Sequence, residues 1–312
     1  MPKLFLAAAL AASFGAAVLG QTQSAIPRTP WGHPDLQGRW TNATLTLAER
    51  PIEFGAKEFF TEEEAAAYSK TALERFLAAI DFTQEAAISG EFVPGVWVEE
   101  RSIVPTRRTS LIVGPTGRVP PLTPAARARA DARNTQRKQG AADDPETRPL
   151  NERCLWFGVG GPPLLPGVGY NSNYQIVQTP THVVVYAEMG GAVRVIPLDG
   201  RPHIPDRVRQ WQGDSRGRFE GDTLVVDTTN FNHKVQFRGS GEHLRLIERF
   251  RRVDRDTITY QFTASDSTSW TDSWMAEVPM RRLDGLLYEF GCHEGNRGMV
   301  NILSGARAIE RP

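Results

Sequence analysis

The stretch YQIVQTPTHVVVY, residues 174–186, decides the fold class. It holds two runs rich in β-branched and aromatic residues, over 174–178 and 182–186, separated by the turn-forming sequence Thr-Pro-Thr. Each run has the length of one strand, and the turn between them is short. The pattern therefore predicts an antiparallel hairpin.

Further predicted strands follow at short intervals between residue 151 and the end of the chain. Parallel strands need long crossovers, so the short Gly- and Asp-containing turns indicate an antiparallel meander. The predicted strand regions are 174–178, 182–186, 193–198, 219–227 with a tight turn inside it, 243–253, 257–263, 275–280 and 286–292. Residues 151–312 are thus predicted to form an antiparallel up-and-down barrel or, failing that, a sandwich. A barrel of about eight strands can enclose one small ligand.

The region before residue 151 has a different character. A basic start at Lys3 and an apolar run to Leu19 predict a signal peptide over residues 1–20. Residues 21–150 are expected to wrap over the barrel and to contain two helices. The first, near 61–82, begins at a capping box of Thr61 and Glu64, and the second, near 124–138, has Pro124 in its first turn.

Charge and cysteine content narrow the class of protein. The 36 basic and 36 acidic residues of the 312 give a formal net charge of zero, which lacks the electrostatic footprint of a nucleic-acid-binding protein. In an exported protein, Cys154 and Cys292 are expected to form a disulfide, with a catalytic thiol or a metal-ligand pair as alternatives. No later segment is apolar enough to span a membrane, so we expect a periplasmic or secreted protein.

Three stretches have distinctive sequences: GDSRGRFEGDTLVVDTTNF at 213–231, IPLDGRPH at 196–203 and CHEGN at 292–296. They resemble a large family of exported bacterial proteins that has no assigned activity, and the resemblance extends from about residue 34 to residue 307. His203 and His293 match the residues of the family's sequence pattern, whereas His233 and His243 do not. Gly38-Arg39-Trp40 is similar to the Gly-x-Trp of the first lipocalin strand, and a lipocalin-like barrel is expected by analogy of fold.

Three residues are candidates for acid/base catalysis. Glu248 is the single carboxylate on a strand face that also carries Leu244, Leu246 and Phe250, and burial there raises a carboxyl pKa as a general acid/base requires. His293 is expected to share a strand face with Glu289, and a histidine beside a carboxylate is a common pairing in proton transfer. Asp227 ends a strand. For Glu248, an arginine or backbone donors opposite it would make the residue structural instead.

A second group of residues is expected to bind substrate: Tyr174, Asn173, Trp211 and Glu294. Aromatic side chains line apolar and sugar-stacking pockets, although they also fill ordinary cores. The histidines show no compact metal-binding spacing, so no cofactor is predicted; any metal is expected on His203 and His293. A phosphate-binding loop and a nucleophile elbow are both missing from the sequence.

The leading functional hypothesis is an exported, cofactor-free enzyme: a lyase, isomerase or hydrolase acting on a small hydrophobic, aromatic or glycosidic substrate. Glu248 and His293 would transfer protons, and Asp227 and Tyr174 would orient the substrate. One alternative is a barrel protein that binds such a ligand without converting it. The other is a metalloenzyme that uses its histidines as ligands.

Overall fold

The computed structural model describes residues 26–79, 99–138, 140, 142–158, 160–167, 169 and 171–310. The predicted signal peptide and the end of the first predicted helix lie outside these ranges. The strands are β1 Gly38–Thr41, β2 Ile112–Val113, β3 Asn173–Gln178, β4 His182–Ala187, β5 Ala192–Pro197, β6 Asp214–Glu220, β7 Thr223–Thr229, β8 Arg245–Arg252, β9 Thr257–Ser265 and β10 Trp274–Arg282. The helices are α1 Glu62–Ala79, α4 Pro124–Lys138 and α5 Arg297–Ile309, with short 3₁₀ turns η1 Ile52–Phe54, η2 Pro145–Thr147 and η3 Met189–Gly191.

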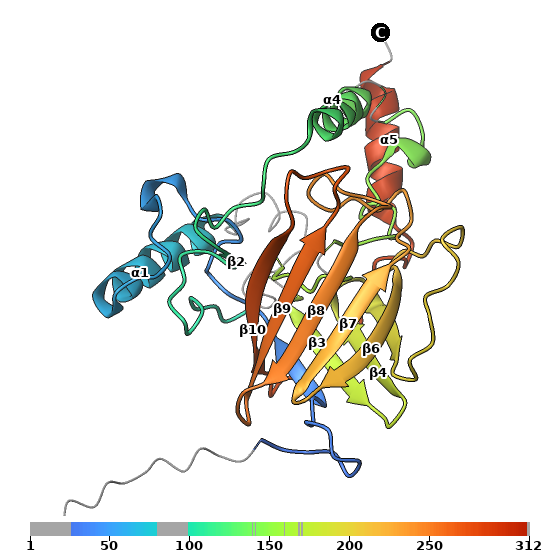
Figure 1. Cartoon of the computed structure of the whole chain (residues 1–312). Helices are drawn as coiled ribbons and strands as arrows, with labels where there is room; N and C mark the ends of the chain where they lie inside the picture. The colour runs from blue at the N-terminus through green and yellow to red at the C-terminus, as the bar shows by residue number, and fades with distance from the viewer. Residues whose placement is uncertain are drawn as a thin grey trace, which may run out of the picture.

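The strands form one antiparallel sheet that curls into a nearly closed barrel (Figure 1). The order is β5-β4-β3-β1-β10-β9-β8-β7-β6, and β2 adds a short pairing to β10. The hairpin predicted at 174–186 is β3–β4, with Val177 opposite Val184. The predicted barrel class is therefore confirmed.

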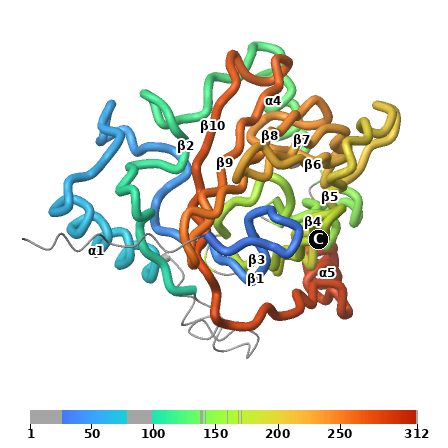
Figure 2. Tube along the Cα trace, turned by 60° about the horizontal axis from the view of Figure 1, so that its bottom comes forward, coloured from blue at the N-terminus to red at the C-terminus, as the bar shows by residue number. Residues whose placement is uncertain are grey.

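Two features of the sheet differ from the sequence prediction. β1 lies between β3 and β10, so the region before residue 151 supplies a barrel strand instead of only wrapping the barrel. The strand predicted at 286–292 is wrong, because these residues have no strand pairing. β1 occupies the place beside β10, and the chain from 283 onward passes outside β1 and β3 (Figure 2).

The barrel closes through side chains where β5 meets β6. These two strands contact each other but are the ends of the hydrogen-bonded strand order. Gly217 on β6 makes the approach possible: a Cβ atom there would lie 2.8 Å from both Ile196 Cγ2 and Leu198 Cδ2. Packing of apolar side chains over a glycine therefore replaces backbone pairing at this seam.

Side chains fill the barrel and chain segments close both of its ends. Figure 2 shows the N-terminal segment across one end, where Gln178 accepts a hydrogen bond from Leu36 N at 3.0 Å and donates one to Pro34 O at 3.2 Å. At the other end, buried Leu164 donates its N–H to the Tyr260 hydroxyl at 3.0 Å. The interior is thus a packed core that includes Trp40.

The two predicted helices are present and a third was not predicted. At α1, Thr61 and Glu64 form the expected capping box, with hydrogen bonds of 2.9 and 3.2 Å. The third helix, α5, is capped by Asn296 and follows the segment after β10 (Figure 1). None of the described helices has the length and apolar character needed to cross a membrane.

The predicted disulfide joins Cys154 to Cys292, with Cα atoms 5.7 Å apart. It ties the segment before β3 to the segment that leads into α5. Asn296 Nδ2 adds a hydrogen bond to Glu152 O at 3.0 Å, and Arg307 on α5 donates to the carbonyls of Ala142 and Asp143. The C-terminal helix is therefore fastened to residues 142–154.

Candidate functional site

Glu248 points into the barrel interior, as its alternation with apolar residues predicted. It is fully buried and accepts hydrogen bonds from Arg194 Nη1 at 3.1 and 2.9 Å. The Tyr260 hydroxyl donates to it at 2.8 Å and the Thr228 hydroxyl at 3.3 Å. Both carboxylate oxygens are thus engaged, and the structural alternative of an arginine opposite Glu248 is the one that the contacts support.

The interior polar cluster extends beyond Glu248 and its direct partners. Burial, followed by the charge of Glu248, raises the pKa of Tyr260 well above its ordinary value, so its hydroxyl keeps the proton that it donates. Ser215 extends the network through a 2.9 Å hydrogen bond with Thr228. Arg194 Nε and Nη2 are buried without a hydrogen-bond partner among the described residues. Because core side chains surround the cluster, its geometry is that of a structural ion pair.

His293 does not meet Glu248. It lies exposed in the segment between β10 and α5, whereas Glu248 lies inside the barrel with three side-chain partners. The expected shared strand face with Glu289 is also lost, because these residues are not in a strand. The structure therefore does not assemble the proton-transfer pair expected from the sequence.

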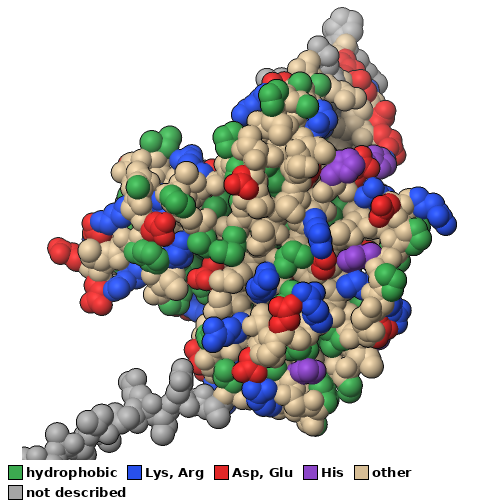
Figure 3. Space-filling model, viewed as in Figure 1, with side chains coloured by type: hydrophobic (Ala, Val, Ile, Leu, Met, Phe, Trp, Pro, Cys, Tyr) green, Lys and Arg blue, Asp and Glu red, His purple; other side chains and the backbone are tan. Residues whose placement is uncertain are grey.

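Asp227 and His203 do come together, on the outer face of β6 and β7. His203 Nδ1 lies 2.7 Å from Oδ2 of buried Asp214, and its Nε2 lies 3.9 Å from Asp227 Oδ2. Arg245 holds Asp227 with two hydrogen bonds of 3.1 and 2.7 Å. Arg216 contacts Asp214 at 2.8 Å. Acidic and basic side chains interleave over this face of the sheet (Figure 3).

The 213–231 motif builds this cluster. It supplies Asp214, Arg216 and Asp227, and its Asn230 donates to the carbonyls of residues 204, 205 and 208, each at 3.1 Å. Those bonds hold the β5–β6 connection, which carries His203, against the sheet. The sequence identified Asp227 and His203 separately but not their juxtaposition, which depends on how this connection folds.

The residues expected to bind substrate are dispersed. Tyr174 is buried, its hydroxyl donates to Leu165 O at 3.0 Å, and burial raises its pKa. Asn173 donates to Glu188 at 2.7 Å. Trp211 packs partly buried against the core, and Glu294 is exposed. Neither of the two cavities described below is lined by any of these four residues.

The described residues do not form the metal site that the sequence left possible on His203 and His293. Within the ranges that the structure describes, no three His, Cys, Asp or Glu residues are grouped so that they could hold a metal ion. His203 contacts two aspartates, but each carboxylate is already paired with an arginine. His293 lies in a different segment, after β10.

A groove of about 1250 Å³ lies between α4, the segment after it and the β7–β8 connection. Its lining residues are Arg133, Gln136, Gly140, Asp143, Glu146, Thr147, Arg148, Pro149, Leu150, Asn151, Arg153, Trp156, Phe157, Gly158, Met189, His233, Lys234, Gln236 and Phe290. Phe157 and Phe290 meet edge to face with ring centroids 4.9 Å apart. The groove therefore combines an aromatic surface with cationic side chains.

The groove lining has more Arg and Lys side chains than Asp and Glu side chains, so it carries a net positive charge. Of its four Arg and Lys side chains, Arg153 pairs with Glu146 at 3.1 Å and Arg148 pairs with Glu152 at 2.8 Å. The side chains of half-buried Arg133 and of Lys234 have no hydrogen-bond or ion-pair partner in the described part of the chain. The Trp156 indole nitrogen is likewise buried and unpartnered there. The side chains of Arg133 and Lys234 are suited to an anionic ligand.

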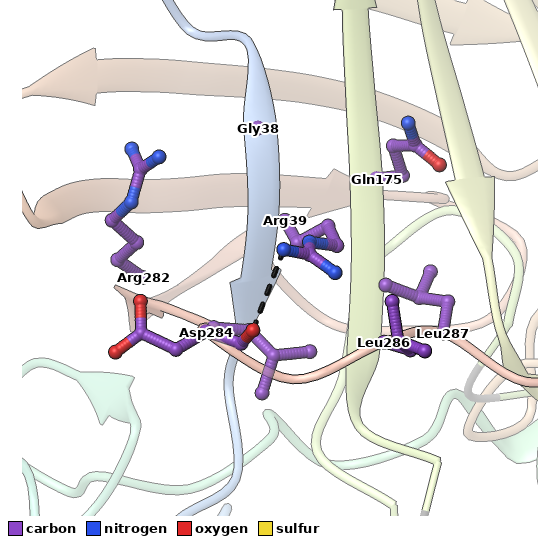
Figure 4. Close-up of a pocket in the computed structure, with 8 residues that line it drawn as sticks. Gly38, Arg39, Gln175, Arg282, Asp284, Leu286 and Leu287 are labelled. Atoms are coloured by element: carbon purple, nitrogen blue, oxygen red, sulfur yellow. Dashed lines mark hydrogen bonds between the residues drawn. The ribbon is translucent and has the colours of Figure 1, made fainter.

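A smaller pocket of about 400 Å³ lies on the outside of the barrel beside β1 and β3 (Figure 4). The chain after β10 crosses it, and Arg39 donates to Asp284 O at 3.4 Å. Arg282 and Gln175 lie on opposite sides of Arg39, and Leu286 and Leu287 also line the pocket (Figure 4). The pocket lacks the aromatic surface of the groove.

Sequence reasoning missed the groove residues. A signal was present: 124–138 carries an excess of arginines on a helix with little apolar surface, and Trp156-Phe157 follow a polar linker. Their proximity arises only from the tertiary fold. No family model, curated protein or solved structure matches the chain, and the geometry of these sites is therefore the basis for a functional proposal.

Proposed function

We propose that this protein binds a small aromatic or amphipathic organic anion in the groove beside α4. This is the ligand-binding alternative among the sequence hypotheses, with the site moved from the barrel interior to the barrel end. The observation that carries it is the presence of two cations without partners, Arg133 and Lys234, on a groove that also exposes Trp156, Phe157 and Phe290.

The dimensions support a small-molecule ligand. Sites for such ligands commonly have volumes of about 300–1,000 Å³, and the groove, at about 1250 Å³, accommodates a molecule of that class. Aromatic rings bind flat apolar groups, while the two cations fix an acidic group by charge-assisted hydrogen bonds. The packed interior around Glu248 supports a site outside the barrel.

The test uses two matched fluorescent probes. 8-Anilinonaphthalene-1-sulfonate carries aromatic rings and one negative charge, and N-phenyl-1-naphthylamine has a similar ring system without the charge. We expect the wild type to bind the sulfonate more tightly. Replacing Arg133 and Lys234 by Gln together should weaken sulfonate binding by about tenfold or more, since about 1.4 kcal/mol of lost interaction corresponds to that factor.

Arg249→Gln is the charge control, because Arg249 is exposed on β8 and does not line the groove. It should leave both affinities within about twofold of the wild type, and the neutral probe should bind the double variant normally. Equal loss of sulfonate binding in Arg249→Gln and in the groove variant contradicts the proposal. So does a wild type that binds the two probes equally.

We also propose that the chain is exported and belongs to the bacterial family that its 213–231 motif resembles. The disulfide and the apolar run before Gln21 support export. Expression of the full chain in a Gram-negative host, followed by fractionation and N-terminal sequencing, tests this. A mature product in the periplasm or medium that starts near residue 21 is expected, and an unprocessed cytoplasmic product contradicts it.

A further inference from the structure

We propose that His203 and Asp227 form a second, hydrolytic site on the outer face of β6 and β7, where they activate a water molecule for attack on a carboxylic ester. This site is separate from the groove and does not depend on the ligand proposed there. Asp214 acts as a positioning residue. The proposal starts from the contacts at the two nitrogens of the His203 ring.

The contact with Asp214 fixes the imidazole tautomer. A carboxylate accepts hydrogen bonds, so the 2.7 Å contact places a hydrogen on His203 Nδ1. Ile204 N donates to Asp214 at 3.2 Å, and Arg216 Nη1 forms an ion pair with it at 2.8 Å, so both contacts hold this carboxylate in place. In the neutral ring, Nε2 then carries the lone pair of a base.

Nε2 faces a second acceptor. Asp227 Oδ2 lies 3.9 Å away, which is too long for a direct hydrogen bond. A water molecule that donates one hydrogen to each acceptor, with hydrogen bonds of about 2.8 Å, fits this separation. Both hydrogens of that water point toward bases, and its oxygen lone pairs point away from them. This is the arrangement that general-base activation of water requires.

The surroundings of His203 and Asp227 favour a small ester that binds at the surface, rather than a substrate that must be enclosed in a deep pocket. The side chain of His203 is 27% exposed, so the base is accessible from solvent without a deep cavity. Arg245 is 57% exposed while it holds Asp227. Because Arg245 Nη2 lies 2.7 Å from Asp227 Oδ2, its guanidinium adjoins the proposed water position, where a positive charge would stabilise the oxyanion that forms on an ester carbonyl.

The reaction balances without a cofactor. His203 Nε2 takes one proton from water as the water oxygen bonds to the ester carbonyl carbon. The tetrahedral oxyanion then collapses, the bond to the alcohol oxygen breaks, and the imidazolium returns its proton to the leaving group. The products are a carboxylic acid and an alcohol, and Asp227 keeps its charge throughout.

p-Nitrophenyl acetate hydrolysis by the full chain is the test, followed at 400 nm as a function of pH. We expect His203→Gln to lower kcat/KM on the order of 100-fold, the usual contribution of a general base. Asp227→Asn, which removes the second acceptor, should also lower kcat/KM. Asp214→Asn should change the pH profile, because an amide can stabilise the other tautomer.

His182→Gln is the matched control, since exposed His182 has only the Thr181 hydroxyl on its ring, at 2.9 Å. It should retain the wild-type rate, and circular dichroism should confirm that each variant is folded. A wild-type rate no higher than that of His203→Gln overturns the proposal, as does an equal loss in His182→Gln. If His203→Gln does not fold, an unchanged rate in folded Asp227→Asn overturns the two-acceptor arrangement.

Discussion

Arg194 and Glu248 are 54 positions apart in the chain and meet inside the barrel, where Arg194 Nη1 donates to both carboxylate oxygens. Arg194 lies on β5, one end of the strand order, and Glu248 lies on β8. Because β5 and β6 share no backbone ladder, this ion pair crosses the interior beside the seam. It therefore links two parts of the sheet that the backbone leaves unconnected there.

Removing either partner of this pair should be strongly destabilising. Arg194→Met leaves a buried carboxylate without its cation, and Glu248→Gln leaves a buried cation; each should lower the free energy of unfolding by about 3–5 kcal/mol. The double variant should lose less than the sum, because neither charge remains. Urea denaturation of all four proteins gives the coupling energy. Strict additivity would show that the two groups do not interact.

Asp266 should contribute to acid sensitivity. Burial raises its pKa, but hydrogen bonds from Ser240 at 2.6 Å and from Thr268 at 2.7 and 2.9 Å outweigh burial and lower the pKa overall. The stability that it contributes is therefore present above the unfolded pKa of about 3.9 and is lost as pH falls through the lower folded value.

In Asp266→Asn the free energy of unfolding should therefore decrease less steeply as the pH falls below about 4. The slope against pH should be smaller by at most about 1.4 kcal/mol per pH unit. Urea denaturation at several values between pH 2.5 and pH 6 measures the slope. An unaltered slope in this variant contradicts the role given to the carboxylate. Ser240→Ala, which removes one of its donors, should have a smaller effect in the same direction.

The Cys154–Cys292 disulfide closes a loop of 138 positions. On the chain-entropy model, a loop of this length stabilises the fold by about 5 kcal/mol. Replacing both cysteines by serine should therefore lower the melting temperature. It should also weaken binding of both naphthalene probes, since Phe157 and Phe290 lie on the two segments that the bond joins. Unchanged probe affinity would show that other contacts hold these segments together.

Gly217 provides a test of the side-chain seam. Gly217→Ala places a methyl group against Ile196 and Leu198 and should cost about 1–3 kcal/mol in unfolding free energy. Gly305→Ala is the control: this position in α5 has open space around it, and alanine is the better helix former by up to about 1 kcal/mol. A neutral Gly217→Ala would mean that the seam can widen.

Local patterns predicted most of the barrel. The hairpin at 174–186, the capping box at Thr61 and the inward direction of Glu248 all follow from periodicity or short-range hydrogen bonding. β1 contains the Gly38-Arg39-Trp40 that is similar to the first lipocalin strand, but its region was predicted to wrap the barrel, because the strand is four residues long and its partners are far along the chain. The wrong strand at 286–292 has suitable residues, but β1 already occupies the edge that it would need.

The candidate sites were predicted less well, for a physical reason. Glu248 could be placed on an apolar face, but its partner Arg194 lies on another strand, and no spacing rule joins them. His203 and Asp227 were each identified without the fold of the β5–β6 connection that brings them together. The groove depends on α4, residues 140–158 and Phe290, whose proximity results from long-range packing and the disulfide.

The position of β1 has a consequence for the order in which the chain folds. β3, β4 and β5 form one meander and β6 to β10 form another, and β1 is the described strand that hydrogen-bonds to both. During synthesis β1 leaves the ribosome first, yet β10 leaves after all the other strands. Contacts of such long sequence separation slow folding, because the entropy of closing the intervening loop is lost before they form. We therefore expect the β1–β10 pairing, which joins the two meanders into one sheet, to form only after synthesis of the chain is complete.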